Sequence, residues 1–475
     1  MSHDGNGGLP RPAMLIPLIV ACALFMENLD ATVITTALPP IARSLHEDPL
    51  RLSLAVTAYL LSLAVFIPLS GWVADRYGAR RVFRSAIVVF TCGSMLCGAA
   101  QNMPELVAAR ILQGIGGALM VPVGRLVLLR NVPKSELVTA LSYLTVPALM
   151  APLLGGPLGG LIATYASWRW IFFINLPIGL LGYWLVSRYI TEVREAEPRG
   201  LDLRGWGLLG TGLAGLVFGL ETLGKDVLPQ ALVAAMLGAG TLLLGGYVWY
   251  ARGRPQAILD LSLLRVPTFA VVISAGSLFR VGIGALALLM PLLLQLGFGL
   301  TPLRSGLLTF SGAIGAMLMK LMAMRIVRRF GFRSLLIANS LIAGAYLLAC
   351  GLLRPEVPQA LIVILMLGSG FFSSLQFTCL NAIAFADVSE SRMSQATSFS
   401  STAQQLSLSV GVGLAAQLLH LRLALRHEGS LLPVDFTWTF AILAAITAGS
   451  ALLYLRLPAE AGFSVSGRRA QAFRR

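Results

Sequence analysis

Charged side chains are scarce in this chain, at 12% of its 475 residues. A soluble globular domain carries roughly a quarter charged residues, so water is not the main solvent of this protein. Histidine is scarcer still, with four residues, all in expected tails, loops or helix ends. The five cysteines lie inside apolar runs, apart from histidine, and are expected to be buried packing residues. These scarcities argue against an enzyme, a metal site or a bound cofactor.

The chain also lacks long polar segments and consists mostly of long apolar runs. Runs of about 20 apolar residues can cross a bilayer as helices, which satisfy their own backbone hydrogen bonds. Nothing between the runs exceeds about twenty residues, which leaves no room for a soluble catalytic or nucleotide-binding domain. The sequence therefore predicts an all-α integral membrane protein with fourteen transmembrane helices, at residues 14–43, 51–73, 82–101, 105–128, 138–163, 170–189, 205–223, 229–250, 269–295, 305–324, 334–353, 359–385, 395–420 and 437–456.

The net charge of +15 is unevenly distributed along the chain. If the N-terminus lies in the cytoplasm, the cytoplasmic loops and tails hold 24 Lys and Arg residues and the opposite loops hold eight. This is the positive-inside asymmetry of membrane proteins, so the basic charge indicates a lipid bilayer as partner and not a nucleic acid. We expect a multi-pass protein of the bacterial inner (plasma) membrane with both termini in the cytoplasm.

Two strings are similar to nucleotide-binding motifs. Residues 219–226 differ from a P-loop because Asp226 replaces the required Ser or Thr, and residues 210–215 match a dinucleotide pattern inside an apolar helix. Neither string follows a strand, which both motifs require. Glycine packing between membrane helices explains them, and no nucleotide partner is expected.

The fourteen predicted helices divide into two sets of six around a central pair. A charged hinge lies between the second and third helices of each set, at residues 71–81 and again at 325–333. Internal repeats of this kind place a substrate site between two bundles that rock against each other. We predict an N-terminal bundle at 1–189, a linker with helices seven and eight at 190–268, and a C-terminal bundle with a basic tail at 269–475, functional as a monomer. The predicted gating residues are Gly71, Asp75, Arg76, Gly78, Arg80, Arg81, Gly331 and Arg333.

Two acids lie within the first predicted helix. Glu27 and Asp30 are three residues apart and therefore share one helix face. They lie about 20 Å from the start of that helix at 1.5 Å per residue. A carboxylate in a low-dielectric cavity can bind and release protons near neutrality. We predict a proton site at Asp30 with Glu27 as the second candidate. The alternative is that one acid reaches the outer boundary of the membrane.

Two cations lie within predicted helices of the second half. Arg280 is about 11 residues from one end of the ninth helix and about 14 from the other, too far for its side chain to reach water. It must therefore face a cavity or a buried partner. Lys320 is about five residues from the cytoplasmic end of its helix, and snorkelling to the surface explains it at least as well. The predicted substrate cavity consists of Arg280, Gln113, Asn28 and Lys320.

Five motifs, in order along the chain, make it similar to a known family. They are the first-helix run 29–39, the hinge 71–81, the fourth-helix run 110–118, the glycine cluster 155–160 of the fifth helix, and the run 168–177. Together they resemble the fourteen-helix drug:proton antiporter family of the major facilitator superfamily, with the MdtD-type multidrug transporters as the most similar group. The resemblance covers essentially the whole chain.

The resemblance implies a proton-coupled efflux transporter that exports small molecules by alternating access, with the proton gradient as its energy source. Asp30 would carry the proton, and Arg110 would be its functional partner. The fifth-helix antiporter motif would pack that helix closely against its neighbours between the halves. The residues of this motif are Gly155, Gly156, Pro157, Gly159 and Gly160.

Arg280 departs from the pattern of this family, whose members need not carry a cation in that helix. A cationic wall suits an anionic or zwitterionic substrate, so we expect export of amphipathic or anionic molecules, such as an organic acid or a metal–chelate anion. Two alternatives stay open. A proton-coupled importer would share the fold, and only the fifth-helix motif argues against it. A transport-inactive membrane sensor would have little reason to keep Asp30, Arg110 and Arg280 buried.

Asp75 lies at the C-terminal end of the second predicted helix, where the helix dipole disfavours an anion. It therefore requires a partner, either a hinge arginine or the start of the thirteenth helix near Ser394, where the resemblance places it. In the second hinge, Arg328 takes the place of Asp75, so we predict a one-sided cytoplasmic latch between the halves. The seventh and eighth predicted helices contain one acid near a membrane boundary, Glu221. Their other residues are typical of helices that pack against lipid.

Overall fold

The computed structural model describes residues 11–131, 150–151, 154–192, 200–223, 228–254, 257–388, 392–426 and 431–458. Every regular element in these ranges is a helix, as predicted for an all-α membrane protein. Twelve of the described helical segments are long and apolar enough to cross a membrane. Of the other two predicted spans, 138–163 lies largely outside the described residues, and 305–324 lies within a 29-residue helix, α12 (Pro302–Phe330). The count of fourteen stays a prediction.

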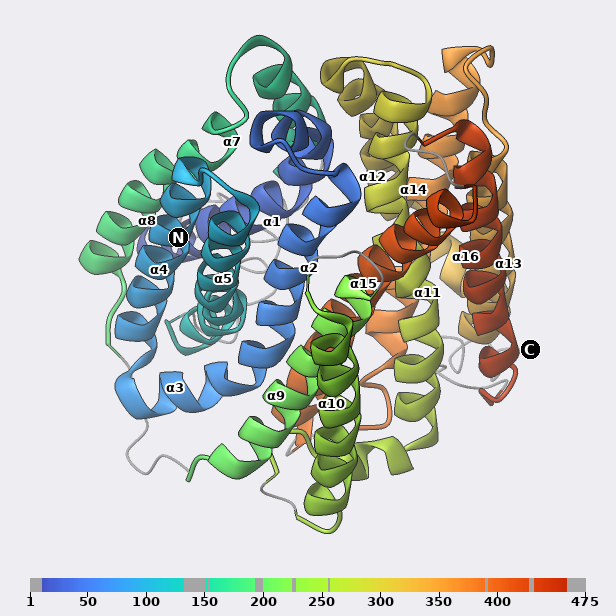
Figure 1. Cartoon of the computed structure of the whole chain (residues 1–475). Coiled ribbons are helices and arrows are strands. Elements are labelled where there is room, and N and C mark those ends of the chain that lie inside the picture. Colours follow the sequence, from blue (N-terminus) through green and yellow to red (C-terminus); the bar gives the residue numbers. More distant parts are fainter. Residues whose placement is uncertain are drawn as a thin grey trace, which may run out of the picture.

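The helices of the first half lie together on one side of the molecule (Figure 1). A tight turn joins the first two helices, and there Asp48 caps the second by accepting a hydrogen bond from Leu50 N–H, with Pro49 in the first helical turn. A further helix runs over residues 154–165. The other elements are α1 (Arg11–Leu45), α2 (Pro49–Phe66), η1 (Ile67–Leu69), α3 (Ser70–Tyr77), α4 (Ala79–Ala99), α5 (Met103–Asn131), α7 (Trp170–Phe173) and α8 (Asn175–Tyr189).

The helices of the second half lie together on the other side (Figure 1). Thr301 caps α12 by accepting a hydrogen bond from Arg304 N–H, and Pro302 occupies its first turn. The remaining elements are η3 (Leu261–Arg265), α11 (Pro267–Leu292), η4 (Leu293–Gly297), α13 (Phe332–Gly351), α14 (Gln359–Ile383), α15 (Met393–Arg426) and α16 (Pro433–Tyr454).

The two charged hinges have the same backbone geometry. Gly78 (φ 93°) joins α3 to α4, and Gly331 (φ 77°) joins α12 to α13. In each case the glycine N–H closes the preceding helix, on the carbonyls of Ala74 and Val327 respectively. Glycine adopts such a positive φ without the strain that a side chain would cause. The glycines that align in the sequence repeat therefore occupy equivalent structural positions.

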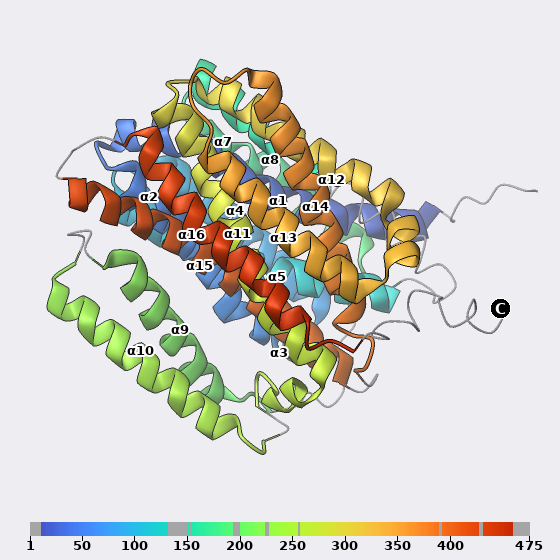
Figure 2. The ribbon, with the colours of Figure 1, turned by 90° about the vertical axis from the view of Figure 1, so that its right-hand side faces the viewer.

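α9 (Leu203–Thr222) and α10 (Gln230–Ala251) form a hairpin on one side of the molecule (Figure 2). α9 packs on both α2 and α15, and one hydrophobic cluster joins the hairpin to α2, α11 and α15. Trp206 of α9 donates from Nε1 to the Val65 carbonyl at 3.0 Å. The expected lipid-facing packing fits α10, most of which is exposed on the outside of the bundle. Glu221 lies in the last turn of α9 as expected, but it is only 1% exposed and therefore packs inside the molecule. The three predicted domain boundaries stay predictions.

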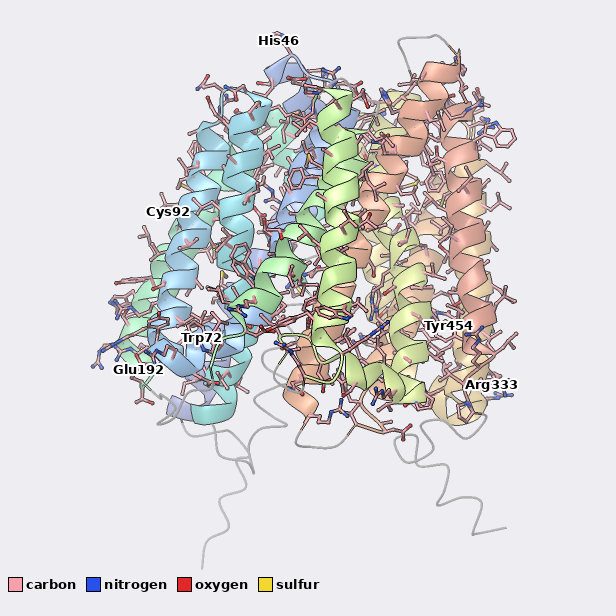
Figure 3. All side chains as sticks on the ribbon, turned by 60° about the horizontal axis from the view of Figure 1, so that its bottom comes forward. His46, Trp72, Cys92, Glu192, Arg333 and Tyr454 are labelled. Carbon is pink, nitrogen blue, oxygen red and sulfur yellow. The ribbon has the colours of Figure 1, made fainter. Side chains whose placement is uncertain are left out.

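The two ends of the helical bundle are marked by different residues (Figure 3). His46 lies at one end, and Trp72, Glu192 and Arg333 lie at the other. We call these the His46 end and the Gly78 end, since Gly78 packs against Glu192. The distribution of basic residues predicts that the Gly78 end faces the cytoplasm.

The two halves of the molecule touch near the His46 end. Gln295 Nε2 of η4 donates to the Thr36 carbonyl of α1 at 2.9 Å. Leu303 N–H of α12 donates to Thr164 Oγ1 at 3.1 Å. This end is therefore closed by direct hydrogen bonds between the halves.

Candidate functional site

Asp30 of α1 and Arg110 of α5 form a fully buried ion pair. Arg110 Nη1 lies 2.5 Å from Asp30 Oδ2, and the exposed fractions of the two side chains are 0% for Arg110 and 1% for Asp30. Arg110 also donates from Nε to the Ala55 carbonyl of α2 at 3.3 Å and lies over the Tyr59 ring, 4.1 Å from its centroid. The guanidinium therefore links α1, α2 and α5 around one carboxylate.

The other carboxylate oxygen of Asp30 is held by two amides. Gln113 Nε2 donates to Oδ1 at 2.8 Å, and Asn175 Nδ2 donates to the same oxygen at 3.3 Å. Gln113 Oε1 accepts from Arg110 Nη1 at 2.7 Å, and Asn175 also donates to Ser94 Oγ at 2.9 Å. We call Asp30, Arg110, Gln113, Asn175 and Ser94 the Asp30 cluster. Gln113, predicted for the substrate cavity, belongs to this cluster.

The chemistry of the Asp30 cluster follows from its donors and acceptors. An ionised carboxylate only accepts hydrogen bonds, and each described contact to Asp30 in the cluster is a donor. A proton bound at Oδ2 would occupy the position of the Arg110 N–H group. Breaking a buried ion pair by neutralising one partner is strongly destabilising, by about 3–5 kcal/mol. Protonation of this carboxylate and its contact with Arg110 therefore oppose each other.

Glu27 lines a cavity of about 390 Å³ between the two halves. It precedes Asp30 in α1, and Ile67 of η1 also lines the cavity, so this space lies on the Gly78 side of the Asp30 cluster. Ligand pockets range over about 300–1,000 Å³. The first half contributes Glu27, Ile67, Gly117, Val121 and Pro122, and the second half contributes Asn381, Phe385, Thr397, Ser400, Ser401, Gln404 and Gln405.

The second-half wall of this cavity was missed by the sequence analysis. Its α15 residues carry hydroxyl and amide groups and are three or four positions apart, from Thr397 to Gln405. That spacing places them on one helix face, and a polar face in an apolar helix is a signal that the sequence contains. Asn175 and Ser94 were also missed, although Asn175 lies within the recognised run 168–177. The cavity therefore has one acid on the first-half wall and uncharged polar groups opposite.

Arg280 of α11 is 1% exposed and is not among the residues that line this cavity. Its guanidinium lies 5.7 Å from the Phe377 ring centroid on α14. Asn381, one turn further along α14, borders the cavity. Among the described residues, Arg280 Nε and Nη1 have no hydrogen-bond partner. Buried donors without acceptors are energetically unfavourable, so the burial of this guanidinium without a described hydrogen-bond acceptor calls for a further partner.

The two other residues predicted for the substrate cavity lie elsewhere. Lys320 of α12 is exposed, and its Nζ donates to Thr378 Oγ1 of α14 at 2.9 Å. Asn28 Nδ2 donates to the Leu24 carbonyl of its own helix at 2.7 Å. In this conformation neither residue borders the cavity.

The glycine cluster at 155–160 contacts two different helices. Gly155 and Gly159 face α1, and a Cβ added at Gly159 would lie 2.8 Å from an α1 carbonyl oxygen. Gly156 and Gly160 face α12 of the other half, and a Cβ added at Gly160 would lie 2.5 Å from an α12 carbonyl oxygen. Pro157 stands between these pairs. Because glycine permits such close backbone approach, the helix at 154–165 packs tightly between the halves.

The first hinge is bonded within its own half. Arg81 Nε lies 3.6 Å from Glu192 Oε2, and Arg80 N–H donates to Glu192 Oε1 at 3.2 Å. The Arg80 side chain also donates to the Ser187 carbonyl at the end of α8. Gly71, at the start of α3, is exposed. These contacts fix α4 to the segment after α8.

The hydrogen bonds described for the first hinge do not test the predicted latch at Asp75. Asp75 is half-buried on α3 and Arg76 beside it is exposed. The side chain of Ser394, the predicted partner position, lies outside those described. Arg333 of the second hinge donates to the Leu455 carbonyl at 2.9 Å, within the second half. The latch stays a prediction.

Comparison with known proteins identifies the class. The chain matches the family model described as Major Facilitator Superfamily over residues 20–412 and 272–473. Two solved transporters have similar folds: a POT family peptide transporter (TM-score 0.68, 16% identity, 97% of each chain) and a D-xylose–proton symporter (TM-score 0.67, 16% identity, 94% of this chain and 98% of the other). The chain therefore belongs to the major facilitator superfamily, and it is a multi-pass membrane transporter and not an enzyme.

Sequence relatives narrow the comparison further. The chain is 37% identical to a Yersinia enterocolitica protein over 468 residues, which cover 96% of this chain and 97% of the relative. It is 39% identical to a Cronobacter sakazakii protein over 449 residues, which cover 93% and 94%. Both relatives carry the provisional name multidrug resistance protein MdtD. The resemblance stated from the motifs is confirmed.

Proposed function

We propose that this protein is a proton-coupled antiporter that exports small molecules across the bacterial inner membrane by alternating access. The observation that carries the proposal is the Asp30 cluster, in which Arg110 binds one oxygen of a buried carboxylate and two amides bind the other. A proton arriving at Asp30 competes with Arg110, which releases α5 from α1. The proton gradient supplies the energy, and a monomer is sufficient.

The conformation of the molecule is one from which export can begin. The halves meet at the His46 end, and the cavity lies toward the Gly78 end, which the charge distribution places in the cytoplasm. A transporter open toward the cytoplasm can load its cargo from that side. The names of the two relatives, which refer to multidrug resistance, support a drug-like cargo.

The charges around the cavity support an amphipathic substrate with an anionic group. Arg280 lies beside Phe377, which is one turn of α14 before the cavity residue Asn381, and it holds donors without partners in the described part of the chain. Glu27 borders the opposite wall, so a zwitterion also fits. Replacing Arg280 by Ala should reduce the export of anionic substrates more than that of cationic ones. Equal loss of both would remove this assignment of substrate charge.

The decisive experiment is transport by the purified protein in proteoliposomes under an imposed pH gradient. Asp30→Asn should abolish gradient-driven flux, because the neutral amide cannot carry the proton. Asp387→Asn, at an exposed acid, is the matched control and should transport normally. Undiminished flux in Asp30→Asn would overturn the mechanism. Substrate movement in the same direction as the proton would establish an importer, and absence of flux in the unmodified protein would favour a sensor.

A further inference from the structure

The hairpin helix α9 carries a buried acid where the two halves meet. Glu221 is 1% exposed and lies toward the His46 end. Ser53 Oγ lies 2.5 Å from Glu221 Oε1 and also 2.5 Å from the Leu50 carbonyl, so these two acceptors share its single hydroxyl hydrogen, and Thr57 Oγ1 lies 3.4 Å from Oε2. Ser53 and Thr57 are one turn apart on α2. The carboxylate therefore attaches α9 to the first half.

A second attachment joins the same turn of α9 to the second half. Gln417 Nε2 of α15 donates to the Leu220 carbonyl at 2.7 Å and to the Glu221 carbonyl at 2.8 Å. Carbonyls in the last turn of a helix have no intrahelical partner, so Gln417 satisfies two of them. A Cβ added at Gly413, one turn earlier on α15, would overlap Glu221 Oε2. Glycine at this position therefore admits the carboxylate.

Packing between α9 and α15 is otherwise incomplete at this end. A cavity of about 470 Å³ lies between the two helices, lined mainly by aliphatic side chains such as Val217, Leu414 and Leu418. Apolar packing joins α9 and α15 further along the helices, and at this end the Gln417 hydrogen bonds add a localised, directional contact.

The geometry of this junction limits how the halves can separate. α2 and α15 belong to different halves, and Ser409 Oγ of α15 also donates to the Thr57 carbonyl of α2 at 3.4 Å. Opening the His46 end requires α2 and α15 to move apart there. Glu221 then cannot keep Ser53 while Gln417 keeps the α9 carbonyls, so one attachment must break.

We propose that the α9–α10 hairpin is a clamp that holds the His46 end closed, and that Glu221 and Gln417 are its two positioning residues. Glu221 binds the first half and Gln417 binds the second half. The clamp stabilises the conformation with its cavity toward the Gly78 end. The clamp acts on the opening and closing of the transporter. It therefore depends on neither the proton coupling nor the substrate charge proposed above.

The test measures the opening of the His46 end directly. Spin labels are placed at His46, in the turn between α1 and α2, and at Glu356, an exposed residue between α13 and α14. Cys92, which is exposed, is replaced by Ser in every variant. The distance distribution between the labels gives the fraction of molecules in which this end is open.

Both arms of the clamp should show the same effect. Ser53→Ala and Gln417→Ala should each raise the open-to-closed ratio about tenfold, because each removes a hydrogen bond to a charged or otherwise unsatisfied acceptor. If one clamp requires both arms, the double variant should open no further than the single variants. An unchanged ratio in both single variants, or effects that simply multiply, would overturn the proposal.

The matched control lies at the other end of the same helix. Asp202 accepts hydrogen bonds from Gly205 N–H, Tyr250 Oη and Ile258 N–H, all within the hairpin and its linker. Asp202→Asn should weaken the hairpin without opening the His46 end. An equal opening in this control would show that the clamp variants act only through loss of folding.

A kinetic measurement separates positioning from simple damage. An exporter that spends less time with its cavity toward the Gly78 end has a lower apparent affinity from that side. Glu221→Gln, which keeps the side-chain shape, should therefore raise KM several-fold with little change in kcat. A fall in kcat with an unchanged KM would contradict the clamp.

Discussion

Gly156 of the helix at 154–165 and Gly306 of α12 meet backbone to backbone across the two halves. A Cβ added at Gly306 would overlap the Gly156 carbonyl. The contact lies beside the Leu303–Thr164 hydrogen bond at the His46 end. The absence of a side chain at Gly306 is therefore a condition for closing this end of the transporter.

Gly306→Ala should oppose closure of the His46 end. Overpacking a tight contact costs about 1–3 kcal/mol, which shifts a two-state equilibrium toward the open conformation by roughly five- to 150-fold. Cysteines at Thr164 and Leu303 should cross-link less readily in the variant. Gly449→Ala on α16 is the control, because no atom of the described residues lies within 4 Å of a Cβ added there. Normal cross-linking in Gly306→Ala would contradict the steric argument.

Arg110→Lys should lower kcat/KM by about tenfold or more, because lysine lacks the planar donor set that binds carboxylate, amide and carbonyl together. Transport at a fixed pH gradient measures this loss. Arg84→Lys is the matched control, since Arg84 donates to Tyr183 Oη at 2.6 Å and stacks on that ring but is not part of the Asp30 cluster. Comparable losses in the two variants would show that Arg110 is only a packing residue.

An ion pair between the linker after α10 and the residue before α15 should depend on pH in its strength. Arg392 Nη2 lies 2.8 Å from Asp260 Oδ2 and donates to Ser262 Oγ at 2.6 Å. Partial burial alone raises the pKa of the Asp260 carboxyl, but hydrogen bonds from Ser262 and Arg392 outweigh it and hold that pKa below its ordinary value. A carboxyl with a lowered folded-state pKa stabilises the fold above its unfolded value of about 3.9 and loses this effect as the pH falls further.

Asp260→Asn should therefore reduce stability at neutral pH by about 1 kcal/mol. The difference from the unmodified protein should shrink as the pH falls below about 4. Thermal unfolding in detergent at several pH values measures both effects. Asp387→Asn, at an exposed acid, serves as the control. A stability difference that is constant over this pH range would exclude the ion pair as its cause.

Asp75→Asn should shift the population toward the conformation with its cavity at the Gly78 end. The predicted latch holds the cytoplasmic side closed, and a partly exposed ionic contact of about 1 kcal/mol corresponds to a shift of about fivefold. Spin labels at His46 and Glu356 should then report a larger fraction with the His46 end closed. A larger open fraction would reverse the proposed direction of the latch.

The Asp30 cluster was partly predictable because its motifs are local. Asp30, Arg110 and Gln113 lie within recognised runs of the first and fourth helices, and the structure brings them together. Asn175 lies in another recognised run, but nothing in that run indicates that its amide reaches Asp30 from α8. That contact depends on how three helices pack, which no single segment specifies.

The cavity was predicted less well than the cluster. Arg280 was expected on its wall from its depth in the helix and from the repeat of the two halves, but the structure buries this residue beside Phe377, outside the cavity lining. The depth of a residue follows from its position along a helix, but the face on which it lies depends on the rotation of that helix. Membrane helices are apolar on every side, so hydropathy constrains this rotation only weakly.

Glu221 shows the same limit most clearly. Its depth near the end of α9 is readable from the sequence, but its burial arises from Ser53 of α2 and from Gln417 and Gly413 of α15. Ser53, for example, is 168 positions away from Glu221 along the chain. Only the packed structure reveals that the hairpin bridges the two halves.

The sequence by itself determined the membrane class, the superfamily, the repeated hinges and the position of Asp30. These properties depend on composition, on short motifs and on local backbone needs, such as the positive φ of Gly78 and Gly331. The tertiary structure alone decided which side chains line the cavity, which end is closed and what α9 contacts. Those properties arise from the packing of helices distant in sequence, where polar groups find partners that apolar patterning does not encode.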